Sequence, residues 1–207
     1  QTELLAVIDD DTRGSRQSLA QLVAALDGGA DIATGLPCYV PARGWWSGLV
    51  TEFVNSAAIL TYLSAAACAE PRSINGMFYA VRTDYVRKNQ LFAVTGRSIT
   101  DDLAIAREIQ RLGGKIVQTT RPQFISTTVT SATHYRRLMH RWFVFTRILI
   151  QSESLMVQAV FAVAYGLHPL LLIALSVLAV VRPSSAIWPL VIVLLLRSAT
   201  LGLLNRT

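Results

Sequence analysis

Leu4-Leu5-Ala6-Val7-Ile8-Asp9-Asp10-Asp11 is the stretch of sequence that decides the fold. Five apolar residues in a row are too few for a helix and suit a strand, and the aspartates that follow mark its carboxyl end. A continuous apolar run is typical of a buried strand in a parallel sheet. Ligands of open α/β sheets bind beyond the carboxyl ends of the strands, so the acidic turn is the first candidate site.

The residues after this strand alternate between two kinds of pattern, which favours an α/β fold. Apolar residues at helical spacing alternate with short apolar runs, and glycine pairs punctuate them. The predicted strands are 4–8, 31–40, 75–81 and 115–120, and the predicted helices are 14–26, 45–69, 83–88 and one that begins at Asp101 after a possible cap at Thr100.

Composition excludes two broad classes of protein. Of the 207 residues, 52% are hydrophobic and 15% are charged, a balance that excludes intrinsic disorder. Two cysteines exclude a disulfide-dense secreted scaffold. The charges are unevenly distributed, because all 13 acidic residues lie at or before Glu153. The part of the chain up to residue 154 therefore reads as a domain that faces water.

Two C-terminal apolar runs predict a transmembrane helical hairpin over residues 155–207. Leu155 to Val181 carries no charge and is long enough to cross a bilayer with some tilt. Gly166 and Pro169 predict a kink in this run. A turn at 182–185 precedes the second run, 186–204.

Residues 134–154 predict an interfacial segment before the hairpin. Residues 134–147 contain four arginines, several aromatic residues and no acid. This composition suits an anionic headgroup surface and places the preceding domain, 1–133, on the cytosolic side. The expected location is therefore integral to a membrane, either a bacterial inner membrane or the eukaryotic Golgi or endoplasmic reticulum. Nucleic-acid binding is the competing interpretation, which the adjoining apolar run disfavours.

Three groups of residues are candidates for chemistry. Asp9 and Asp11 can converge on Mg²⁺ or Mn²⁺ together with substrate phosphates, or else form a solvated turn in which Asp11 caps the next helix. Asp101 and Asp102 begin a helix, where an acid can cap the helix or act as a general base. Arg141 and Trp142 can bind phosphate and stack on a ring, or anchor the chain at an interface; the sequence leaves all three choices open.

The order of these groups resembles family 2 glycosyltransferases. Val7-Ile8-Asp9-Asp10-Asp11-Thr12 is similar to their D-x-D strand, and Asn75 to Arg82 to their strand with glycine, here Gly76, six residues before arginine. Thr100-Asp101-Asp102 resembles their acidic helix start, and Leu138-Met139-His140-Arg141-Trp142 their Q/R-x-x-R-W motif, with leucine in the first position. The ceramide glucosyltransferase branch, with its bacterial relatives, is the most similar.

The resemblance implies a partial GT-A type domain, followed by membrane helices, that transfers a hexose with inversion from a UDP-sugar to a lipid hydroxyl at the cytosolic face. Asp9 and Asp11 would hold a divalent metal, Mg²⁺ or Mn²⁺, against the donor diphosphate, and Asp102 would be the general base. Asp101, Gly76, Arg141 and Trp142 would contact the substrates. The nucleotide-binding strands of the family are expected before Gln1. The partners implied are a UDP-sugar, a ceramide-like, hopanoid or polyprenoid lipid, and the bilayer, with no nucleic acid.

Two alternatives remain open at this point. A processive polysaccharide synthase shares the same motifs but carries more membrane spans. A membrane-anchored module without activity would use the aspartates as caps and turns.

Overall fold

The computed structural model describes residues 3–40, 42–58, 62, 65–68, 70–97, 100–163 and 167–204. The chain divides into two compact units, residues 1–141 and 142–207, and each is described by itself. The elements of the first unit are β1 (Leu4–Ile8), β2 (Thr12–Arg13), α1 (Arg16–Asp27), β3 (Ile32–Tyr39), α2 (Trp45–Ala58), α3 (Ala65–Cys68), β4 (Phe78–Arg82), α4 (Thr83–Asn89), the 3₁₀ helix η2 (Leu91–Arg97), α5 (Asp101–Arg111), β5 (Ile116–Ile125) and the first half of α6 (Ala132–Gln151).

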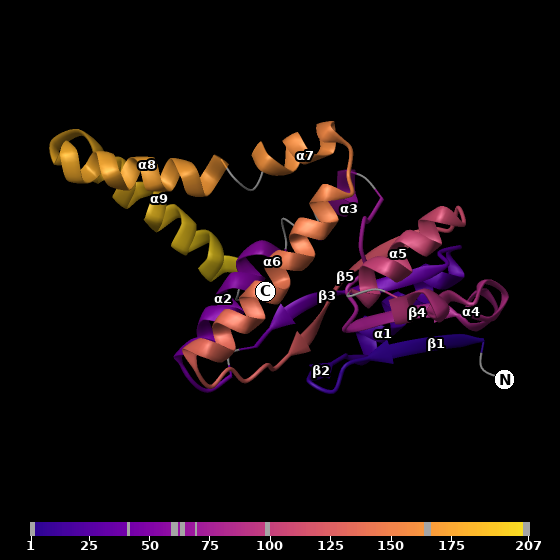
Figure 1. Cartoon of the computed structure of the whole chain (residues 1–207). Coiled ribbons are helices and arrows are strands. Elements are labelled where there is room, and N and C mark those ends of the chain that lie inside the picture. Colours follow the sequence, from indigo (N-terminus) through magenta and orange to yellow (C-terminus); the bar gives the residue numbers. More distant parts are fainter. Residues whose placement is uncertain are drawn as a thin grey trace. The chain divides into compact units, whose positions relative to one another are not determined.

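A mixed five-stranded sheet organises the first unit, with the strand order β1-β4-β3-β5-β2 (Figure 1). Strands β3 and β5 are parallel, whereas β4 runs antiparallel to both β1 and β3. The α/β class is confirmed, but the expectation of a buried parallel β1 is wrong. β1 pairs along its length only with β4 and has no fully buried residue. An apolar run indicates that some side chains of a strand are packed against other residues. It does not indicate whether the neighbouring strand runs parallel or antiparallel.

The strand directions decide which residues meet at one edge of the sheet. β1, β3 and β5 point the same way, so their carboxyl ends share an edge with the start of β4. This edge receives the acidic turn 9–11, the loop 75–77 and the residues that follow β5. Helix α5 begins at the same edge, because it must return along the sheet before β5 starts.

Two hydrophobic cores cover the two faces of the sheet. Helix α1 packs Leu22 and Leu26 onto one face, against Ala33 and Phe78. Helix α5, with α4 and η2, covers the other face, and its core residues are Ile32, Ile74, Tyr79, Val81, Leu91, Ile105, Ala106, Ile109 and Ile116. This arrangement of helices on both faces is the layered architecture that the alternating pattern predicts.

The observed elements differ from the predicted ones where the pattern is interrupted. The helix expected over 45–69 is described as α2 and the short α3, and residues 59–61, 63–64 and 69 lie outside the described residues. β5 continues past Pro122, a proline that lies two residues beyond the expected end of the strand at 120. The pairing of β5 with β3 changes register between Thr34 and Leu36, and this shift accommodates the proline.

The second unit consists of the end of α6, followed by α7 (Leu155–Phe161), α8 (Leu167–Val181) and α9 (Pro183–Leu204). α8 and α9 pack against each other as a hairpin with Arg182 between them. Pro169 lies in the first turn of α8, where its missing N–H is not needed, and therefore does not kink that helix. The predicted kink at Gly166 lies outside the described residues.

The predicted transmembrane character of this hairpin is not borne out. Among the described residues, none of the helices combines the length and the apolarity required to cross a bilayer. Residues 164–166, between α7 and α8, lie outside the described residues. α8 spans 15 residues, a rise of about 22 Å against the roughly 30 Å of a bilayer core.

Candidate active site

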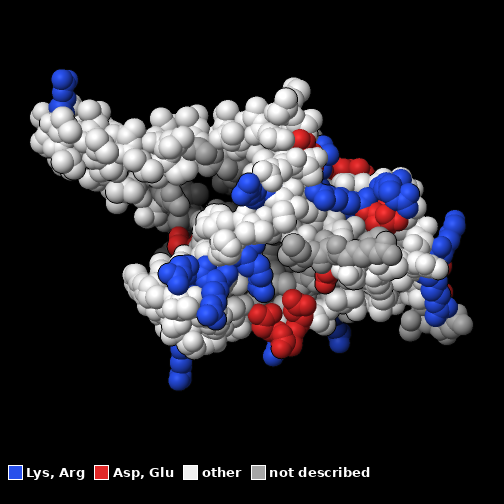
Figure 2. All heavy atoms as spheres, in the orientation of Figure 1, with Lys and Arg blue, Asp and Glu red and all other residues white. Residues whose placement is uncertain are grey.

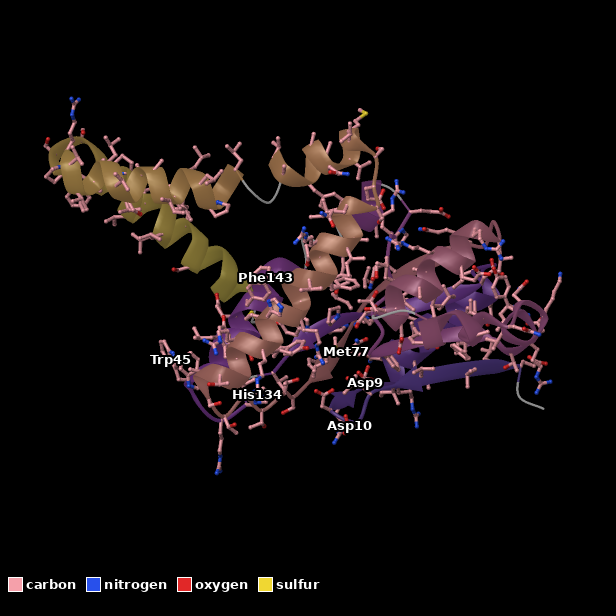
Figure 3. The ribbon with its side chains drawn as sticks, in the orientation of Figure 1. Asp9, Asp10, Trp45, Met77, His134 and Phe143 are labelled. Atoms are coloured by element: carbon pink, nitrogen blue, oxygen red, sulfur yellow. The ribbon has the colours of Figure 1, made fainter. Side chains whose placement is uncertain are left out.

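The acidic turn that follows β1 is a hydrogen-bonded turn at the shared sheet edge. The Asp9 N–H donates to the Met77 carbonyl at 3.0 Å, and the Asp9 carbonyl accepts from the Thr12 N–H at 3.1 Å. Figure 3 shows Asp9 beside Met77, with Asp10 next to it, and the carboxylates of Asp9 and Asp10 are exposed. Helix α1 starts only at Arg16 and is capped by Ser15 through a capping box with Ser18, so the aspartates do not cap it.

Asp11 is held more firmly than its two neighbours. Its Oδ2 accepts a hydrogen bond from Thr127 Oγ1 at 2.8 Å, and its backbone carbonyl accepts from the Ser126 N–H at 3.0 Å. Both donors follow the end of β5. The structure thus ties the turn after β1 to the turn after β5, two positions 116 residues apart in the sequence.

The turn concentrates negative charge, and neither of the ion pairs found among the described residues involves its three carboxylates. Burial raises the pKa of Asp9, and repulsion from Asp11 and then Asp10 raises this pKa further. Within the described residues no three His, Cys, Asp or Glu side chains form a metal cluster. Two carboxylates with mutual repulsion nevertheless fit Mg²⁺ or Mn²⁺, which take one or two protein carboxylates and complete their coordination with substrate phosphates and water.

The acidic start of α5 lies at the same edge of the sheet. Asp101 is exposed and Asp102 is half-buried. The Leu103 N–H donates to Asp102 Oδ1 at 2.8 Å, whereas Thr100 occupies the capping position without a capping hydrogen bond from its side chain. Burial raises the pKa of Asp102, against the lowering effect of its backbone hydrogen bonds, and the neighbouring Asp101 charge adds to the rise.

Gly76 borders Asp102 closely. A Cβ on Gly76 would lie 3.2 Å from Asp102 Cβ and 3.8 Å from Asp102 Oδ2. The loop before β4 therefore approaches Asp102 so closely that a larger residue at position 76 would have to displace it by a few tenths of an ångström. This contact brings together two of the residues that the sequence singled out, from segments 26 positions apart.

Sequence reasoning missed three tyrosines whose ionisation is affected by these acidic groups. Burial raises the pKa of Tyr79 to about 12, with contributions from Asp101, Asp9 and Asp102 in that order. Burial also raises the pKa of Tyr62 to about 12, with a contribution from Asp102. The loop 75–77 links the two groups directly, because the Met77 carbonyl accepts from the Asp9 N–H at 3.0 Å and Gly76 borders Asp102.

Tyr39 is the third of these tyrosines. Burial raises its pKa to about 12, the charge of Asp11 raises it further, and a hydrogen bond with Thr127 and the charge of Arg141 oppose this rise. Asn55 of α2 fixes the backbone of Tyr39, because its amide accepts from the Tyr39 N–H and donates to the Tyr39 carbonyl, each at 2.8 Å. Tyr39 lies near the carboxyl end of the predicted strand 31–40. This position is the sequence signal that could have placed Tyr39 at the same edge of the sheet.

Arg141 belongs to the same neighbourhood through its effect on Tyr39. It is exposed on α6, as are Arg136 and Arg137, and Figure 2 shows basic side chains to one side of the acidic cluster. Leu138 is buried, so the first position of its motif packs into the first unit in place of a polar contact. Trp142 is the next residue of α6 but belongs to the second unit, and its expected contact with substrate stays a prediction.

These features define a class of protein: an α/β domain with two facing acidic groups, one at a strand end and one at a helix start, beside exposed arginines. The sequence model of the family described as Glycosyl transferase family group 2 matches residues 4–203. The chain belongs to this family, whose activity is the transfer of a sugar from a nucleotide-sugar donor. A search of curated proteins finds no match.

Proposed function

We propose that this glycosyltransferase moves a hexose from a UDP-sugar to the hydroxyl of a membrane lipid, with inversion at the anomeric carbon. The observation that carries the proposal is that the loop 75–77 contacts both acidic groups: the Met77 carbonyl accepts from the Asp9 N–H at 3.0 Å, and a Cβ on Gly76 would lie 3.2 Å from Asp102 Cβ. Donor activation and acceptor deprotonation have to occur within one substrate length of each other, and this arrangement permits both.

Asp9 and Asp11 are proposed to hold a divalent cation, Mg²⁺ or Mn²⁺, at the donor diphosphate. When bound, the cation would neutralise charge on the departing UDP. The protein residues have a separate task, which is to keep two mutually repelling carboxylates aimed at the same point. Arg141, on the same edge, adds a guanidinium that can pair with a phosphate.

Asp102 is proposed as the general base. The Leu103 N–H donates to its Oδ1, and Oδ2 is proposed to accept the proton of the acceptor hydroxyl. The acceptor oxygen then bonds to the anomeric carbon while the bond from that carbon to the diphosphate oxygen breaks, and UDP leaves with the electron pair. A carboxylate with a raised pKa is the stronger base, provided that it is ionised at the working pH. Asp101 and Gly76 are proposed to border the bound substrates beside it.

The lipid acceptor is proposed from the second unit and from α6. The α8–α9 hairpin exposes large apolar side chains, among them Leu170, Val180, Trp188 and Leu195, each at least 63% exposed. The exposed arginines of α6 complement anionic headgroups. We infer that these surfaces associate with a bilayer and bring the enzyme to its acceptor.

Transfer of labelled sugar from a UDP-sugar to lipid in vesicles, with ceramide or a polyprenol as the acceptor, tests this function. We expect Asp102→Asn to lower the rate by at least about a thousandfold, because general-base catalysis contributes up to about 10⁴. Asp84→Asn is the matched control: Asp84 also lies in the first turn of a helix and accepts from the next N–H, at 2.9 Å, but follows β4 at the opposite sheet edge.

Equal activity of the two variants would remove Asp102 from the base role. Labelled product that is a water-soluble polymer would replace the lipid acceptor by a growing polysaccharide. Transfer that is unchanged when vesicles are omitted would refute the membrane acceptor.

A further inference from the structure

Thr127 occupies a position that the proposed chemistry does not yet explain. It follows β5 and donates a hydrogen bond of 2.8 Å to Asp11 Oδ2. Thr127 is half-buried, whereas the adjacent Thr128 is exposed. Among the described residues, the other oxygen of the carboxylate, Asp11 Oδ1, has only the long 3.4 Å contact from Thr12 Oγ1. The hydroxyl of Thr127 is therefore the principal restraint on the orientation of the Asp11 carboxylate.

The backbone reinforces this restraint. The Ser126 N–H donates to the Asp11 carbonyl at 3.0 Å, so residues 126–127 hold Asp11 at both its backbone and its side chain. Asp9 and Asp10 receive no comparable side-chain support in the described part of the chain. Of the two carboxylates proposed for the cation, one is thus fixed and the other is adjustable.

Tyr39 borders this hydrogen bond from the side of β3. Its phenol donates its one proton to Met77 Sδ at 3.7 Å. The Asn55 contacts hold the backbone of Tyr39 from α2. Tyr39 is therefore a fixed neighbour of the site, and the donor to the Asp11 carboxylate is Thr127.

We propose that Thr127 is a positioning residue for the cation-binding carboxylate of Asp11. The inference rests on the proposed cation role of Asp9 and Asp11. The fixed hydroxyl donor occupies one lone pair of the Asp11 carboxylate and limits its rotation. The remaining lone pairs are then held in place for the cation. Without that donor the carboxylate can rotate, and part of the cation affinity is then lost in ordering it again.

The test is the affinity of the purified chain for Mn²⁺ in the presence of UDP, measured by titration calorimetry. We expect Thr127→Val, which keeps the shape and removes the hydroxyl, to weaken Mn²⁺ binding about tenfold, at the lower end of losses for residues that support metal ligands. Thr127→Ser should bind within about threefold of the unaltered protein, because it restores the donor.

Thr128→Val is the matched control, since it removes an exposed threonine hydroxyl one residue further along. Equal affinities for Thr127→Val and the unaltered protein would overturn the positioning role alone. Equal weakening by Thr127→Val and Thr128→Val would also overturn it, because the loss would not depend on the hydrogen bond to Asp11. Absence of Mn²⁺ binding by the unaltered protein would overturn the cation assignment together with the positioning role.

Discussion

Gly76→Ala perturbs the proposed base without touching its carboxylate. The new Cβ would lie 3.2 Å from Asp102 Cβ, and its distance to Oδ2 would be an ordinary 3.8 Å. Relaxed carbon contacts are about 3.5–4.0 Å, so Asp102 must move by about 0.3–0.8 Å. A misplacement of about 1 Å at a reacting group can cost about a hundredfold in rate, and half of that displacement implies a loss of about tenfold. Gly76 is not among the glycines with positive φ, so backbone strain does not add to this effect.

The assay is the rate of sugar transfer at saturating substrates, with urea unfolding measured in parallel. We expect kcat to fall about tenfold while the free energy of unfolding falls by about 1 kcal/mol, the lower end for a small overpacking. Gly96→Ala is the control, because nothing lies within 4 Å of its Cβ position. A kcat within twofold of the unaltered enzyme would refute the claim that the position of Asp102 limits the reaction.

The remaining predictions concern Asp102 and the α2 contact. The raised pKa of Asp102 means that kcat should fall as pH falls through a value above the ordinary 3.9 or so of aspartate, and Asp101→Asn should move this limb of the pH profile to lower pH. Because the ionised form is disfavoured in the fold, Asp102→Asn should raise the melting temperature at pH 7, and the gain should vanish as pH falls through the raised pKa. Asn55→Ala removes both hydrogen bonds to the Tyr39 backbone and should lower the free energy of unfolding by about 1–3 kcal/mol, measured in urea.

The sequence predicted the elements best where local patterns decide them. The strand 4–8 has the predicted bounds, and the helix that begins at Asp101 ends before Gly113 as expected. Both depend on short-range signals, namely an apolar run that ends in acids and a helix that ends at a glycine pair. The hairpin of α8 and α9 also follows from the two apolar runs, although α9 begins at Pro183, inside the turn that was predicted over 182–185.

Contacts between distant segments could not be read in the same way. The antiparallel pairing of β1 with β4 depends on which strands become neighbours, and no local pattern encodes that choice. The bond from Thr127 to Asp11 was missed for the same reason, and also because the predicted strand stopped at residue 120, before Pro122. No local pattern singled out Tyr39, Tyr62 and Tyr79, and only the fold brings them within the influence of the carboxylates.

Bringing these carboxylates together lowers the stability of the fold, and this loss argues for a functional site and against a purely structural role. The pKa of both Asp9 and Asp102 is raised, so the ionised form of each destabilises the fold at neutral pH. A turn and a helix start could be built from serine or asparagine without this cost, as Ser15 does at the start of α1. A cation at Asp9 and Asp11 would relieve the repulsion between them, and it follows that Mn²⁺ with UDP should stabilise the protein against unfolding. At this edge of the sheet, the ionised carboxylates that serve the proposed catalysis lower the stability of the fold. Substrate binding would offset that loss of stability.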